Sequence, residues 1–149
     1  MFKTNRVGIT LLTLDFTTNI KKYQGGNFML TVYVSHPYGG KEENKKIVED
    51  FIRQKQKKYK DVTFISPIHT FGWQYNEVDY VKGINDCLDL LSRCDAIITK
   101  RLDEVLDSRG CIIEVGYARG KGLNLVLWDK FDEYMKRFDD DFEDDEDED

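Results

Sequence analysis

The stretch TVYVSHPYGGKEENKK, from Thr31 to Lys46, decides the fold of this 149-residue chain. Residues 30–35 (LTVYVS) are apolar and rich in β-branched side chains, which predicts a buried strand. The turn that follows is polar and carries Ser35, His36, Pro37, Tyr38, Gly39 and Gly40. Because α/β proteins bind ligands where a strand turns into a helix, we expect this turn to form the rim of a binding site.

The segments after this turn alternate between helical and strand patterns. Ile47, Val48, Phe51 and Ile52 give residues 41–58 the apolar stripe of an amphipathic helix. Further strands are predicted at 61–66, 95–99 and 123–128, further helices near 84–94 and 108–122, and an irregular aromatic loop at 67–80. The order β-α-β-α-β-α-β predicts a single-domain α/β fold, a Rossmann-like three-layer sandwich around a doubly wound parallel sheet.

The charge is divided unevenly along the chain. Of the 28 acidic residues, ten lie in 139–149, so residues 1–138 carry 18 acidic against 22 basic side chains. We therefore expect a domain at 29–130 and an acidic C-terminal tail at 131–149 that is disordered from 139.

Residues 1–28 do not extend the alternation and are interpreted as an N-terminal extension. Back-translation of residues 24–29 permits a purine-rich stretch, a short A/T-rich spacer and ATG, which looks like a bacterial ribosome-binding site. One hypothesis is that Met29 is the natural start. The alternative is a genuine extra strand at VGITLLTLDF, residues 7–16.

Cysteine and histidine usage argues against metal and disulfide chemistry. Cys87, Cys94 and Cys111 are odd in number and form no CxxC pair, which favours a reducing, cytoplasmic location. His36 and His69 lie in different predicted loops with no evident third ligand, so we expect no metal and no cofactor. No apolar run approaches the roughly 20 residues of a membrane span.

Residues 108–114 (SRGCIIE) have the form S-x-G-x-x-x-E at the start of a predicted helix. Ser108 is suited to cap the helix and Gly110 to let a ligand approach the backbone, which together predict an anion site. Arg109 projects near this site and could pair with a phosphate. Glu114 lies one to two turns further along, among apolar residues rather than on a solvated face.

Together, YVSHPYGG, CLDLLSRCD and SRG…E resemble the nucleoside 2-deoxyribosyltransferase superfamily, which includes the 2′-deoxynucleoside 5′-phosphate N-hydrolases. The similarity covers roughly residues 30–128 and is greatest to small uncharacterised phage and bacterial members. It implies that Glu114 is the nucleophile at C1′ of the sugar and that Tyr33 hydrogen-bonds this carboxylate. It also implies that Ser108 and Gly110 hold the 5′-phosphate of a nucleotide.

Further expectations follow from the resemblance. The ligand is a nucleoside or nucleotide rather than a nucleic acid, and a homo-oligomer is expected to complete the pocket. Trp73 and Tyr75 are candidates for stacking on a base or sugar. The binding residues that we predict in the turn are Ser35, His36, Pro37, Tyr38 and Gly39.

The chain departs from the family at one position. Catalytic members carry an aspartate eight residues before the one that opens the third strand, here Asp95, and counting back gives Cys87. Asp86 and Asp89 are nearby substitutes for this acid. Two functions therefore stay open: an enzyme that cleaves or transfers an N-glycosidic bond, and a catalytically weak, phage-encoded nucleotide-binding or sensing module. A carboxyl facing Glu114 would favour the first, and a pocket lined by Cys87 the second.

Overall fold

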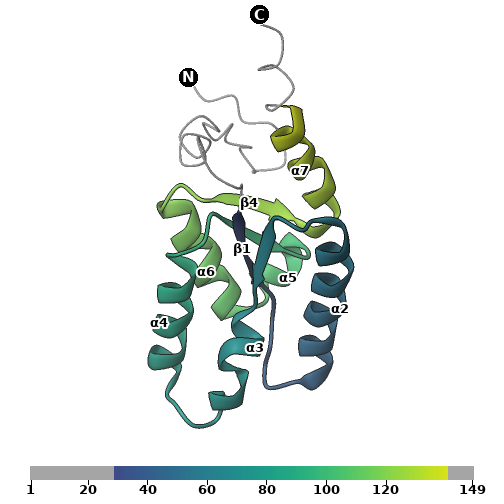
Figure 1. The fold of residues 1–149 in the computed structure, drawn as a ribbon. Helices are drawn as coiled ribbons and strands as arrows, with labels where there is room; N and C mark the ends of the chain where they lie inside the picture. The colour runs from purple at the N-terminus through teal and green to yellow at the C-terminus, as the bar shows by residue number, and fades with distance from the viewer. Residues whose placement is uncertain (1–28, 141–149) are drawn as a thin grey trace, which may run out of the picture.

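The computed structural model describes residues 29–140, which form a four-stranded, all-parallel sheet between two layers of helices (Figure 1). The strands are β1 (Leu30–Ser35), β2 (Val62–Ile65), β3 (Ala96–Thr99) and β4 (Asn124–Leu127), ordered β2-β1-β3-β4 across the sheet. From β1 the chain moves to β2 at one edge of the sheet, and from β3 it moves to β4 at the other edge. The predicted single-domain, Rossmann-like α/β fold is confirmed, with its topological switch point between β1 and β3.

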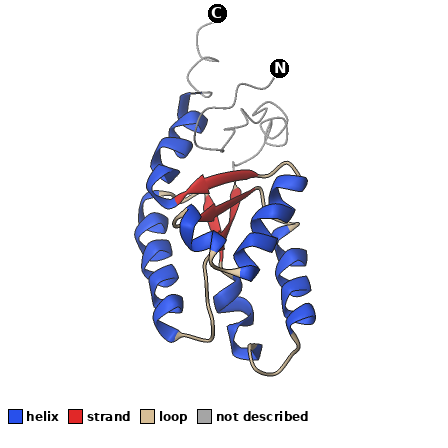
Figure 2. Cartoon of the chain, turned by 180° about the vertical axis from the view of Figure 1, so that it is seen from behind, coloured by secondary structure: helices blue, strands red, loops and turns tan. Residues whose placement is uncertain are grey.

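Helices cover both faces of the sheet (Figure 2). One face packs against α2 (Glu42–Lys58) and α7 (Phe131–Asp140), the other against α4 (Tyr80–Leu91) and α6 (Arg109–Gly120). Short helices complete the connections: α3 (Pro67–Phe71), α5 (Leu102–Leu106), and the 3-10 turns η2 (Gly72–Gln74) and η3 (Trp128–Lys130). Within residues 29–140, no helix combines the length and the apolar character that crossing a bilayer requires.

Strand β1 sends alternate side chains into the two layers. Val32 and Val34 pack in the cluster beneath α2 and α7, whereas Tyr33 packs in the cluster beneath α4 and α6. All three are fully buried. Since this alternation runs to the carboxyl end of β1, the residues around that end reach both layers of the molecule.

The segment predicted as an irregular loop at 67–80 begins with a helix. Pro67 occupies the first turn of α3, and the Ser66 hydroxyl accepts a hydrogen bond from the His69 N–H at 3.4 Å. Pro67 and Ile68 are buried. A serine cap followed by proline is a known helix start, so the prediction was wrong because the polar composition outweighed this local signal.

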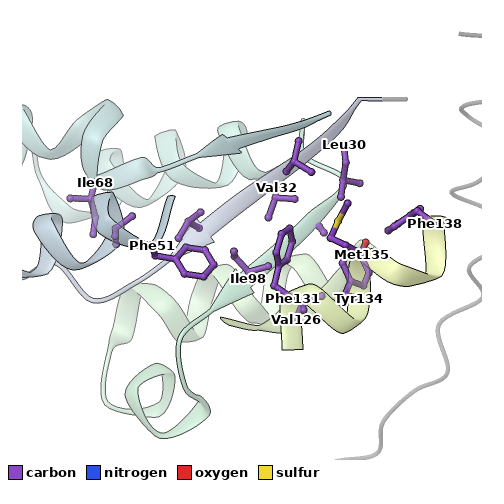
Figure 3. Packing of buried hydrophobic residues seen from close by; sticks show 14 residues of the cluster. Leu30, Val32, Phe51, Ile68, Ile98, Val126, Phe131, Tyr134, Met135 and Phe138 are labelled. Atoms are coloured by element: carbon purple, nitrogen blue, oxygen red, sulfur yellow. The ribbon is translucent and has the colours of Figure 1, made fainter. Parts of the chain in front are cut away.

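The predicted tail starts too early at 131. Helix α7 carries four apolar side chains at i, i+3, i+4 and i+7, which all lie in the core (Figure 3): Phe131, Tyr134, Met135 and Phe138. Asp132 joins α7 to α2, because it accepts hydrogen bonds from the Lys55 ammonium at 3.0 Å and the Tyr59 hydroxyl at 2.6 Å. The domain therefore continues through Phe138.

Two predictions concern the ends of the chain. The start at Met29 and the extra strand at 7–16 depend on residues 1–28, which lie outside the described residues. Of the segment predicted to be disordered, 139–149, residues 141–149 also lie outside the described residues.

Truncation after Phe138 should leave thermal stability almost unchanged. It removes ten acidic residues but keeps the apolar face of α7 that packs in the core. The melting temperature of the shortened chain, measured by circular dichroism, should lie within a few degrees of the full-length value. A large decrease would mean that residues 139–149 contribute contacts to the domain.

Candidate functional site

A cavity of about 550 Å³ lies where the turn after β1, the α3–α4 segment and the start of α6 meet. Its volume is in the range of small-molecule sites, and its place near the switch point of the sheet is the usual one for ligands in this architecture. Eight residues predicted from the sequence to bind or react line it: His36, Tyr38, Gly39, Tyr75, Ser108, Arg109, Gly110 and Glu114.

Glu114 is a buried carboxylate in the second turn of α6, with only 6% of its surface exposed. The Tyr33 hydroxyl donates a hydrogen bond to its Oε1 at 2.8 Å, and the Ser35 hydroxyl donates to Oε2 at 2.5 Å. Both donors come from the same face of β1, two residues apart. The structure thus places Glu114 in the cavity wall and in contact with Tyr33, as the resemblance implied.

Burial sets the protonation of this cluster. It raises the pKa of Glu114 to about 7, against the opposing effect of the hydrogen bonds from Ser35 and Tyr33. Burial also raises the pKa of Tyr33, as do the nearby Glu114 carboxylate and Cys87. Tyr33 therefore remains a hydrogen-bond donor while Glu114 titrates near neutral pH.

The N-terminus of α6 faces the cavity. The Ser108 hydroxyl accepts a hydrogen bond from the Cys111 N–H at 3.4 Å, which is the predicted cap. A Cβ at Gly110 would meet only the Tyr80 hydroxyl, at an ordinary 3.8 Å, so packing within the protein does not require glycine there. The Arg109 guanidinium lies over the Tyr80 ring, 5.4 Å from its centroid, beside the cavity. These features suit a helix N-terminus that binds an anion.

The turn after β1 needs both of its glycines, Gly39 because of its backbone conformation and Gly40 because of its conformation and a close contact. Gly39 and Gly40 have φ of +59° and +71°, a region that disfavours side chains. A Cβ on Gly40 would also lie 3.0 Å from the Tyr75 ring. Tyr75 in turn packs edge-on against Tyr38, with ring centroids 5.2 Å apart, so two segments distant in sequence form one rim of the cavity.

Some predicted binding residues lie elsewhere. Trp73 is 71% exposed, its indole N–H donates to the Thr70 carbonyl at 3.1 Å, and it does not line the cavity. Of the two stacking candidates, Tyr75 is the one that does. Pro37 is half-buried and also outside the cavity lining. Ser35 is fully buried and contacts the site through Glu114.

Neither of the predicted acids in α4 faces Glu114. Asp86 accepts hydrogen bonds from Lys82 and Gln74, and Asp89 is an exposed partner of Arg93. Neither carboxylate lines the cavity. Successive residues of a helix are rotated by about 100°, so Asp86 and Asp89 point away from the direction of Cys87, which lines the cavity. The assignment of Asp86 or Asp89 as the acid is therefore not supported.

Cys87 occupies that inward position in the cavity wall. Burial raises the pKa of its thiol to about 12, and the Glu114 carboxylate adds to this rise. The thiol is therefore neutral at physiological pH. Cys87 therefore contributes no negative charge to the cavity wall at this position.

Sequence reasoning missed most of the wall formed by the α3–α4 segment. The residues there that were not named in advance include Pro67, Ile68, Phe71, Gly72, Gln74, Val78, Asp79 and Tyr80. Tyr80, Ile84 and Cys87 follow a helical i, i+4, i+7 spacing, which is the signal that could have identified this face.

Known proteins offer no guide to this cavity. Comparisons with protein-family models, curated proteins and solved structures gave no match. Within residues 29–140, no group of three or more His, Cys, Asp or Glu side chains is arranged to hold a metal ion. The function must therefore be argued from the geometry of the site.

Proposed function

We propose that this protein cleaves the N-glycosidic bond of a 2′-deoxynucleoside 5′-monophosphate, with Glu114 as the nucleophile. One observation carries the proposal: a buried carboxylate, held by two hydroxyl donors, shares a cavity with a helix N-terminus. The first feature suits attack on an electrophilic carbon, and the second suits a phosphate.

In the reaction, an oxygen of Glu114 forms a bond to C1′ while the bond from C1′ to the base nitrogen breaks. The base leaves with the electron pair, and the negative carboxylate stabilises the oxocarbenium-like transition state. Tyr33 and Ser35 contribute by fixing the orientation of the carboxylate through their hydrogen bonds.

The 5′-phosphate is assigned to the start of α6. Backbone N–H groups of a first helical turn lack intrahelical partners, and the helix dipole favours negative charge. Arg109, steadied by the Tyr80 ring, is the nearby cation that lines the cavity. The base would then extend toward the aromatic rim of Tyr38 and Tyr75.

The criterion that the sequence set between the two functions favours the second, a nucleotide-binding module, whereas the buried carboxylate and its two donors support the first. Cys87, rather than a carboxylate of α4, lines the cavity next to Glu114. On this alternative, the protein binds a nucleotide at the same site and releases the base slowly or not at all. The cytoplasmic location and the homo-oligomer that we infer from the sequence remain predictions under both functions.

The test is incubation of the full chain with a panel of 2′-deoxynucleosides and their 5′-monophosphates, followed by chromatography for free base. We expect release from at least one monophosphate, and slower release from the matching nucleoside, which lacks the phosphate. Binding of a monophosphate without any release would select the second function.

The rate of base release should rise with pH through about 7. Burial raises the pKa of Glu114 to about 7, so the carboxyl is mostly protonated below that pH and cannot attack C1′. Above it the nucleophile is ionised. A pH-rate profile under saturating substrate checks this, and a rate that falls between pH 6 and 8 would contradict the role of Glu114.

A further inference from the structure

The carboxyl end of β1 sends its side chains to both faces of the sheet. Tyr33 and Ser35 reach Glu114 on one side, and His36 packs on the other, against the layer of α2 and α7. His36 is buried, with 8% of its surface exposed, yet it forms part of the cavity wall. Because His36 and Glu114 both line the cavity, a ligand that fills it can contact both groups.

The His36 ring is held in place by stacking. It stacks on the Trp128 ring with centroids 5.6 Å apart, and Trp128 stacks on Phe51 at 4.1 Å. The imidazole thus lies at the end of a stack of three rings, with Trp128 in the middle.

The Nδ1 atom of His36 faces a carboxylate. It lies 3.9 Å from Oε2 of Glu104, and the other oxygen of Glu104 lies 3.6 Å from the Lys100 ammonium. Within the described part of the chain, both Nδ1 and this Oε2 are buried and have no hydrogen-bond partner. A small rotation of the carboxylate would bring the two atoms into hydrogen-bond distance, which would satisfy both.

This arrangement favours the tautomer of His36 that carries its proton on Nδ1. A carboxylate beside Nδ1 keeps the proton on that nitrogen and leaves the lone pair on Nε2. Because Nδ1 is fully enclosed, the ring edge that can contribute to the cavity wall is the one that carries Nε2. Burial also lowers the pKa of His36, and Lys100 acts in the same direction against Glu104, so the ring is a neutral base near pH 7.

We propose that His36, oriented by Glu104, is the general base that activates water to release the sugar from Glu114, which makes the protein a hydrolase. This inference rests on the proposed function. Water loses a proton to Nε2 of His36, its oxygen forms a bond to C1′, and the bond from C1′ to Glu114 breaks and restores the carboxylate. The proton then passes from His36 to the departed base or to solvent.

The other carboxylate in the cavity wall is a weaker candidate for this base. Asp79 is exposed and caps α4, accepting a hydrogen bond from the Lys82 N–H at 2.8 Å. Asparagine at this position would keep the cap and remove the charge. The variant Asp79→Asn therefore tests the rival directly.

The experiment mixes the His36→Gln variant with the 5′-monophosphate that the wild type cleaves fastest. It follows release of the base over time and measures the mass of the intact protein. Glutamine keeps a polar group but cannot accept the proton. We expect a burst of about one base per protein, an added deoxyribosyl phosphate on the protein, and steady turnover reduced roughly 10²- to 10⁴-fold. Glu104→Gln should show the same burst with a smaller reduction, because it affects only the orientation and basicity of His36.

The exposed His69, outside the cavity lining, provides the matched control, and His69→Gln should behave like the wild type. Wild-type turnover in both His36→Gln and Glu104→Gln would overturn the inference, as would a burst in Asp79→Asn instead. Loss of burst and turnover together in a folded His36→Gln variant would also overturn it, since His36 would then act before the sugar is transferred. No base release by the wild type would overturn the proposed function itself.

Discussion

Replacement of Glu114 by glutamine should lower the rate of base release at least about 10⁴-fold while leaving nucleotide binding almost intact. The amide cannot form the bond to C1′, so the covalent step is lost. The phosphate site at the start of α6 uses backbone N–H groups and Arg109, which the substitution does not alter. Chromatography of the free base measures the first effect, and titration calorimetry with the monophosphate measures the second.

The same variant should be more stable than the wild type at pH 8. The folded protein raises the pKa of Glu114 from 4.5 to about 7, so folding takes up a proton between these values. Wild-type stability therefore falls as pH rises through this window, by an amount on the order of 3 kcal/mol, and levels off above it. Glutamine does not titrate and avoids this loss.

Asp89→Asn is the matched control for both effects. It also replaces a carboxylate by its amide, but Asp89 is exposed, pairs with Arg93 and does not line the cavity. We expect little change in rate or stability. Undiminished turnover in Glu114→Gln would remove Glu114 from the mechanism, whatever the stability result.

Phe131→Ala should destabilise the protein by about 3 to 5 kcal/mol, a large part of the stability of a typical domain. Phe131 is fully buried at the start of α7, and its ring packs against Tyr59 and Phe64, with centroids 5.4 and 5.6 Å away. The substitution leaves a cavity between α7, α2 and the sheet. Chemical denaturation followed by circular dichroism measures the loss.

Glu133→Ala, on the exposed face of the same helix, is the control and should change stability by less than about 0.5 kcal/mol. A chain that ends at Lys130 should lose more than Phe131→Ala does, because it lacks all four apolar side chains of α7. Equal stability of the Lys130 truncation and the full chain would contradict the placement of α7 in the core.

The parallel sheet was predictable because each strand is a short, nearly continuous apolar run. Residues 30–35 and 95–99 have this pattern, which is typical of strands covered on both faces. Glu114 was singled out by its apolar neighbours in a capped helix together with the resemblance, because neither a cap nor a carboxylate alone is specific.

Helix α7 was not predicted because its charges conceal its periodicity. Residues 131–140 include four acidic side chains and lead into the acidic segment, so composition favoured a tail over a helix. The apolar residues at 131, 134, 135 and 138 are decisive only when a surface exists for them to cover.

The pair of His36 and Glu104 was also beyond sequence reasoning. The two residues are 68 positions apart, and only the meeting of β1 with α5 brings them together. Spacing alone also could not show that Cys87, and not Asp86, lines the cavity, because this depends on the rotation of α4 against α6.

The most direct test of the central claim is to trap the sugar on Glu114. An arabino-configured 2′-fluoro analogue of the best monophosphate suits this purpose, because the fluorine destabilises the oxocarbenium-like transition state and slows hydrolysis of the intermediate. After incubation, proteolysis and mass spectrometry should find the fluorinated sugar phosphate on the peptide that contains Glu114. Release of the base with an unmodified Glu114 peptide, or with the sugar on another residue, would contradict the account.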